Sequence, residues 1–119
     1  MSKLSTHVLD TANGRPAAGM KIDFVRNPGA SEQLVKSVVT NSDGRTDELL
    51  LTADQMVAGE YELRFDVGGY FASGGGGESD GGLAFLNIVP VRFTITDPGQ
   101  GYHVPLVCSQ WSFSTYRGS

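Results

Sequence analysis

The sequence predicts an all-β protein, a sandwich of roughly seven or eight strands with one short helix. Apolar and polar side chains alternate with a period of two residues along several stretches, as half-buried strands require. Turn signals such as Asn13-Gly14 and Asp43-Gly44 separate these stretches. A chain of 119 residues suits one domain, so we expect residues 1–119 to form a single unit.

The first half of the chain contains four candidate strands. Ile22 and Phe24 share one face of the second of them, and the third is rich in β-branched residues. The fourth is short and is expected to be an edge strand. The expected strands are residues 4–10, 21–26, 34–40 and 46–51.

The second half carries the clearest strand pattern, at residues 60–67. Tyr61, Leu63 and Phe65 occupy one face, and charged residues such as Glu62 occupy the other, which is expected to be the wet one. The helical signal is weak: Thr52 and Gln55 have capping-box spacing, but Gly59 ends the segment, and residues 70–72 could form another short turn. The remaining expected strands are residues 91–96, 102–108 and 111–116.

Composition excludes several classes of function. The formal net charge of −4 argues against a nucleic-acid partner, which needs a clustered basic surface. No apolar run has the length of a membrane helix, and residues 1–7 lack the apolar core of a secretion signal, so we expect none here. The single cysteine, Cys108, cannot form an internal disulfide, so a reducing cytoplasm is the expected location.

Half of the glycines lie between residues 68 and 82. We expect a flexible loop at about 73–83, and this segment has no Walker motif.

Few residues could carry chemistry. His7 and His103 are the two histidines, and two histidines make a poor zinc site, so no metal is expected. Arg45 follows a turn and offers a planar fork of donors, although a solvated turn arginine is the simpler interpretation. Cys108 follows an apolar strand and is expected to be a packing residue rather than a nucleophile. Pro105 cannot donate a ladder hydrogen bond, which predicts that its strand lies at an edge or carries a bulge.

Five short motifs taken together resemble one family over essentially the whole chain. They are Leu-Ser-Thr-His-Val-Leu-Asp-Thr at 4–11, Gly-Arg-Pro-Ala-Ala-Gly at 14–19, Asn-Ser-Asp-Gly-Arg-Thr at 41–46, Tyr-His-Val-Pro-Leu at 102–106 and Ser-Thr-Tyr-Arg-Gly-Ser at 114–119. This set resembles 5-hydroxyisourate hydrolase, the transthyretin-related enzyme of purine degradation. The terminal Tyr-Arg-Gly-Ser is the specific part, because it separates the enzyme from the hormone carrier transthyretin. Gln110, where the family usually has proline, and the glycine-rich stretch depart from the pattern.

The resemblance implies a prealbumin-like sandwich and a homotetramer whose cavities lie between subunits. It also implies cofactor-free hydrolysis of 5-hydroxyisourate to 2-oxo-4-hydroxy-4-carboxy-5-ureidoimidazoline, with opening of the six-membered ring. Carried over by position, the catalytic residues are His7, Arg45, His103 and Ser119, and the substrate-binding residues are Tyr116, Arg117 and Gly118.

The chemistry of these side chains suits the reaction. Histidine titrates near neutral pH, so His7 and His103 could share water activation and proton delivery in either order. Arg45 would orient the substrate and stabilise oxyanion charge. Two other interpretations remain open: a transthyretin-like carrier of small molecules, and a structural β-sandwich module in which the histidines are incidental.

Overall fold

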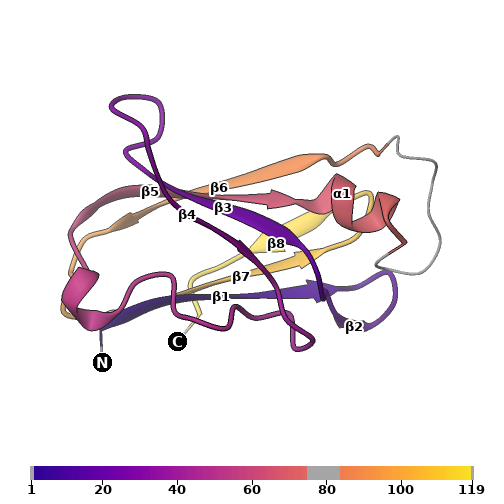
Figure 1. Cartoon of the computed structure of the whole chain (residues 1–119), viewed down its shortest axis with the longest axis horizontal. Coiled ribbons are helices and arrows are strands. Elements are labelled where there is room, and N and C mark those ends of the chain that lie inside the picture. The colour runs from indigo at the N-terminus through magenta and orange to yellow at the C-terminus, as the bar shows by residue number, and fades with distance from the viewer. Residues whose placement is uncertain (1, 75–83, 119) are drawn as a thin grey trace.

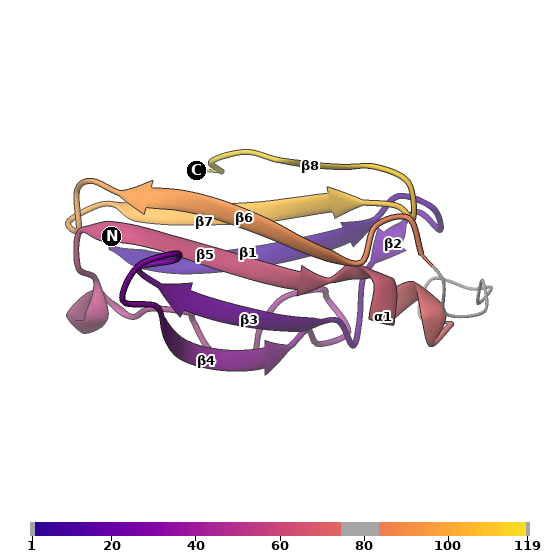
Figure 2. The same cartoon turned by 90° about the horizontal axis from the view of Figure 1, so that it is seen from above.

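The structure is a sandwich of two four-stranded sheets (Figures 1 and 2). This computed structural model describes residues 2–74 and 84–118. One sheet has the order β2-β1-β7-β8, built from Arg15–Pro16, Lys3–Asp10, Gly101–Cys108 and Phe113–Thr115. The other has the order β4-β3-β5-β6, built from Gln33–Val39, Lys21–Arg26, Gly59–Asp66 and Ile88–Ile95. The expected two-layer β architecture is therefore present in the described residues, and seven of its eight strands coincide with expected ones.

The core lies between the sheets and follows the period-two alternation. Leu4 and Val8 of β1 are fully buried, and so are Leu63 and Phe65 of β5. Tyr61 is also buried, and its ring stacks between those of neighbouring strands. Because alternate residues fill the core, the intervening residues of β1 and β7 are left on the outer face of their sheet.

The two ends of the chain meet in one sheet, because β1 and β7 pair in parallel along their whole length. Their register sets Ser5 opposite His103 and His7 opposite Pro105. The other strand pairs are antiparallel. The N-terminal and C-terminal motifs are nearly a hundred residues apart in sequence, and this pairing makes them neighbours.

The prediction of an edge strand at residues 46–51 is wrong. The segment before Thr52 follows the edge of β1 but touches it at separate places: Val8 donates to the Gly44 carbonyl, and Leu4 exchanges backbone hydrogen bonds with Leu50 and Leu51. No continuous ladder connects these points, so only an isolated bridge forms between Leu4 and Leu51. The edge strand of this sheet is instead the two-residue β2, which the sequence pattern did not indicate.

The helical segments agree with the expectation in part: residues 70–72 are helical, but they belong to a longer helix than expected. The capping box of Thr52 and Gln55 is present, but it supports only the one-turn 3₁₀ helix η1 at Ala53–Gln55. The α-helix is α1 at Val67–Ala72, where the Asp66 carboxylate caps the helix by accepting from the Gly69 amide. The strand expected at 60–67 therefore ends at Asp66. Of the expected loop at 73–83, residues 75–83 lie outside the described residues.

Pro105 does not mark an edge or a bulge, so this prediction is also wrong. Its strand β7 lies inside the sheet between β1 and β8, in an unbroken parallel register with β1. The missing N–H is accommodated on the β8 side, because β8 ends at Thr115 and pairing resumes only at a bridge between His103 and Gly118. The Thr115 hydroxyl donates to the Pro105 carbonyl across this gap.

Candidate active site

The outer face of the β1–β7 pair carries Ser5, His7 and His103, all of them partly buried. Each alternates with buried neighbours of the same strand, so all three side chains project from the same side of the sheet. The parallel register brings the two histidines within two residue positions of each other.

His103 has a partner on either side. Its Nδ1 lies 2.8 Å from the Ser5 hydroxyl of β1. Its backbone carbonyl accepts from the Gly118 amide at 2.7 Å, which holds the end of the chain against β7. Partial burial lowers the pKa of the His103 imidazole below its usual value, and the positive charges of Arg45 and His7 lower it further. At neutral pH His103 is therefore mainly uncharged and able to accept a proton.

His7 is held differently. Its Nε2 lies 2.9 Å from the backbone carbonyl of Asp43. A carbonyl oxygen can only accept a hydrogen bond, so Nε2 must carry a proton. When the ring is neutral, its lone pair is therefore on Nδ1.

Arg45 reaches this face through the turn that follows β4. The Asn41 side-chain oxygen accepts from the backbone amides of both Asp43 and Arg45, which closes the turn. Gly44 has a φ of +74° and its carbonyl accepts from Val8 at 2.8 Å, so the turn docks on β1 beside His7. Arg45 is exposed, and its charge acts on the His103 ring.

The predicted residues of the C-terminal motif take different directions. Gly118 lies against His103, whereas Tyr116 is 61% exposed. Arg117 packs over the Tyr102 ring at 4.2 Å from its centroid and donates to Gln100 and Gly101. Because Tyr102 points into the sandwich, this places Arg117 away from the histidines. Ser119 lies outside the described residues.

The structure thus brings together His7, Arg45, His103 and Gly118, and it leaves Arg117 outside this group. Ser5 was not among the residues predicted for the site. Its signal in the sequence was its position two residues before His7, which puts both side chains on the same face of a strand.

The described part of the chain has no group of three His, Cys, Asp or Glu side chains that could hold a metal ion. The site offers imidazoles, a guanidinium and a hydroxyl, which are the groups of acid–base and oxyanion chemistry.

Burial raises the pKa of the Cys108 thiol to about 12, and the Asp10 carboxylate contributes to this rise. The thiol therefore stays protonated, as a packing residue would. Across residues 2–74 and 84–118, no helix is both long and apolar enough to span a bilayer.

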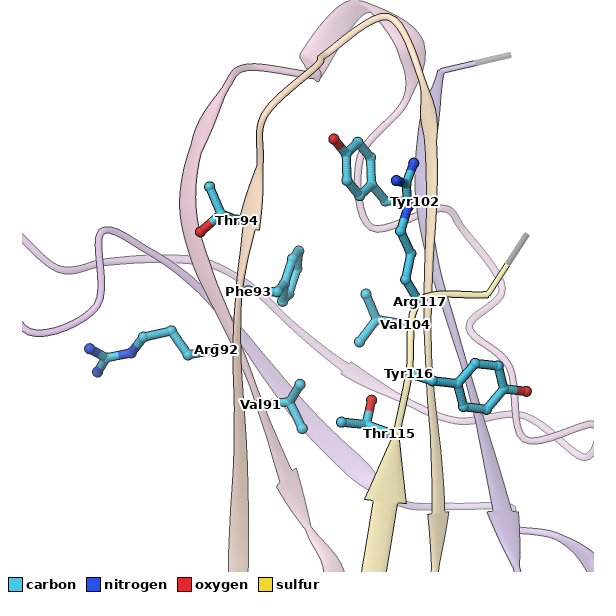
Figure 3. Close-up of a pocket in the computed structure, with 9 residues that line it drawn as sticks. All are labelled: Val91, Arg92, Phe93, Thr94, Tyr102, Val104, Thr115, Tyr116 and Arg117. Carbon is cyan, nitrogen blue, oxygen red and sulfur yellow. The ribbon is translucent and has the colours of Figure 1, made fainter.

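A second feature lies at the side of the sandwich where β6 and β8 are the outermost strands (Figure 3). It is a mainly apolar groove of about 250 Å³ between the two sheets. In Figure 3, Phe93 and Val104 face each other across it, and Tyr116 points away. The lining residues are Val91, Arg92, Phe93, Thr94, Tyr102, Val104, Thr115, Tyr116 and Arg117.

Known proteins resemble this chain over its full length. The family profile described as "HIUase/Transthyretin family" matches residues 4–118. The 5-hydroxyisourate hydrolase 2 of Rhizobium meliloti is 51% identical over 117 residues, covering 98% of this chain and 96% of the relative. The structure of Klebsiella pneumoniae 5-hydroxyisourate hydrolase matches with a TM-score of 0.80 at 32% identity and covers all of both chains. A crystal structure of (S)-allantoin synthase matches at a TM-score of 0.87 and 46% identity, covering 99% of this chain but 44% of that one. This chain belongs to the HIUase/Transthyretin family.

Proposed function

We propose that the protein is an enzyme that hydrolyses 5-hydroxyisourate to 2-oxo-4-hydroxy-4-carboxy-5-ureidoimidazoline. The observation that carries this proposal is the pair His7 and His103 on one sheet face, with Arg45 in the turn docked beside them, in a chain 51% identical to a named 5-hydroxyisourate hydrolase. The cluster also argues against the carrier alternative, because a carrier of apolar molecules needs apolar walls there. The substrate-binding roles of Tyr116, Arg117 and Gly118 and the role of Ser119 remain predictions.

In the proposed mechanism, His103 acts as the general base. Its lowered pKa keeps it uncharged at neutral pH, so it accepts a proton from water as the water oxygen attacks a ring carbonyl carbon. The carbonyl oxygen becomes negatively charged, and the Arg45 guanidinium stabilises that charge. When the carbon–nitrogen bond breaks, the leaving nitrogen takes a proton from Nδ1 of His7 in its imidazolium form, since Nε2 stays bonded to the Asp43 carbonyl. The proton that His103 removed from water then leaves to solvent, and His7 takes one up from solvent, which restores both rings.

The proposal includes assembly into a homotetramer with sites between subunits. Two observations support association: the apolar groove, and the unpaired outer edges of β6 and β8 that flank it. We also propose a cytoplasmic location, which agrees with the single, buried and unpaired Cys108.

The test uses freshly prepared 5-hydroxyisourate, made from urate with an oxidase, and follows its ultraviolet absorbance. The wild-type protein is expected to accelerate the decay over the spontaneous rate. His103→Asn is expected to lose about 10²–10⁴-fold in kcat, the usual effect of removing a general base. Circular dichroism and native mass must match the wild type for this comparison to count.

Two results would reject the proposal. The enzyme assignment fails if the wild-type protein does not accelerate the decay, and tight binding without turnover would then favour the carrier. The role of His103 fails if folded, correctly assembled His103→Asn keeps full activity.

A further inference from the structure

Ser5 is the first part of an arrangement that fixes the ring of His103. Ser5 and His103 are direct partners in the parallel β1–β7 register, and the Ser5 hydroxyl lies 2.8 Å from Nδ1. Both residues are half-buried, and the side chains next to each of them in sequence are buried in the core. Within residues 2–74 and 84–118, Ser5 is the one hydrogen-bonding partner of this ring.

Gly118 holds the opposite edge of the ring. A Cβ atom added at Gly118 would lie only 2.7 Å from Cδ2 of His103 and 3.3 Å from its Cβ and Cγ. The backbone of Gly118 is fixed in this position because its amide donates to the His103 carbonyl at 2.7 Å. A side chain here would therefore push the imidazole ring or break the backbone contact.

These two contacts determine which ring atoms remain available. Ser5 faces the Nδ1 edge and Gly118 faces the Cδ2 edge, so the Cε1–Nε2 edge points outward from the sheet. This is the direction from which a substrate on the outer face would approach. Nε2 is then the nitrogen available for proton transfer, provided that Nδ1 carries the ring's proton.

We propose that Ser5 and Gly118 are positioning residues for His103. The Ser5 hydroxyl accepts a hydrogen bond from Nδ1–H. Gly118, which has no side chain, leaves room for the ring to project from the sheet with its Nε2 lone pair facing the substrate. This inference rests on the proposed function for its kinetic consequence. Its structural part, the tautomer and orientation of the ring, is independent of any reaction.

Ser5→Ala is the first test. Without the hydroxyl the ring loses its orientation and its fixed tautomer, so kcat should fall by about 10–100-fold with KM little changed. Ser5→Thr keeps a hydroxyl at the same position and should retain nearly full activity. Ser37→Ala is the matched control, because it removes a strand serine hydroxyl bonded to Asp23 in the other sheet.

Gly118→Ala tests the other side of the ring. It should also lower kcat, whereas Gly99→Ala, in a loop before β7, should leave kcat unchanged. Thermal unfolding of each variant shows whether the subunit remains folded.

The second readout needs no substrate. The protein has only two histidines, so a long-range nitrogen–proton NMR spectrum of untagged, isotopically labelled protein contains two ring systems, which the His103→Asn variant assigns. Above neutral pH, Nδ1 of His103 should appear protonated and Nε2 unprotonated. Ser5→Ala should move both resonances toward an average of the two tautomers, and Ser5→Thr should restore them.

The outcomes separate the two proposals. If the wild type shows the expected tautomer but no turnover, the proposed function fails and the positioning of the ring stands. If the wild type is active but Nδ1 is unprotonated, or if Ser5→Ala changes neither the spectrum nor kcat, the positioning role is overturned.

Discussion

The two histidines of the site differ in their hydrogen-bonding partners, and this difference separates what each can do. The Asp43 carbonyl requires a proton on Nε2 of His7 at all times. The Ser5 hydroxyl can remain bonded to Nδ1 of His103 whether that ring is neutral or charged. His103 can therefore change its charge during a reaction cycle without losing its orientation.

The charge of Arg45 is expected to tune His103. Burial lowers the pKa of His103 first, and Arg45 is the next cause. Because a nearby cation disfavours the imidazolium, Arg45→Gln should raise the pKa of His103. In the wild type, kcat/KM should fall as the pH drops through the lowered pKa. In Arg45→Gln this acidic limb should move to higher pH, and the overall rate should also fall by about 10²–10³-fold from lost oxyanion stabilisation.

The measurement is a pH profile of kcat/KM together with an NMR titration of His103, which reports its pKa without substrate. Lys21→Gln removes one positive charge from the other sheet and should leave the titration in place. A titration of His103 that stays unchanged in Arg45→Gln would show that the guanidinium does not act on this ring.

Single residues also show what the sequence could and could not predict. The histidines and Arg45 are predicted because their motifs occur together and in order along the chain, but Ser5 has no distinctive signal except its face on the strand. Glu62 was expected on a wet face, yet it is only 5% exposed. Its carboxylate pairs with Arg64, two residues along the same strand, and with Arg92 of β6, and the cross-strand partner depends on tertiary packing rather than on alternation.

Among the elements, the turn at 41–46 delivers Arg45 to the site, and Gly44 controls how closely it docks. Gly44 and Gly19 both have positive φ, at +74° and +82°, so alanine is strained at either position. A Cβ at Gly44 would in addition collide with the Val8 carbonyl oxygen, whereas nothing lies within 4 Å of one at Gly19.

Gly19→Ala should therefore lower the free energy of unfolding by about 1–2 kcal/mol with little change in kcat. Gly44→Ala should cost roughly 1–3 kcal/mol more, because the turn must move off β1, and it should also lower kcat. Urea unfolding and steady-state kinetics measure both effects. Equal losses of stability and activity in the two variants would mean that docking of the turn on β1 does not position the site.

The elements predicted well were β1, whose burial alternates strictly, and β5, whose apolar and charged residues alternate in the sequence. Local pattern failed where long-range contacts decide the backbone. Residues 46–51 are apolar enough for a strand, but β1 bonds them at separate points. Helix α1 follows β5 without a break, because the Asp66 carboxylate caps the Gly69 amide, and a short helix with two glycines carries no periodicity to detect.

For the whole molecule, the site and the groove lie on different sides of one sheet, and both are open in the single chain. The outer face of β1 and β7 carries the histidines. The groove lies at the edge formed by β6 and β8 (Figure 3). Residues 115–118 connect them, because Thr115 lines the groove and Gly118 touches His103. Contact between subunits at the groove would therefore also hold the segment that supports His103.

This connection predicts that activity depends on assembly. Native mass should be four times the chain mass of 12.7 kDa. The rate per subunit should fall when the protein is diluted to concentrations at which the subunits dissociate.

Thr94 is exposed in the single chain and lines the groove, so Thr94→Glu should leave the subunit folded but place a charge inside the contact between subunits. We expect a lower native mass and lost activity. Gln33→Glu, which adds the same charge on the opposite edge strand β4, should keep both, and a fully active monomer of Thr94→Glu would refute the link between assembly and the site.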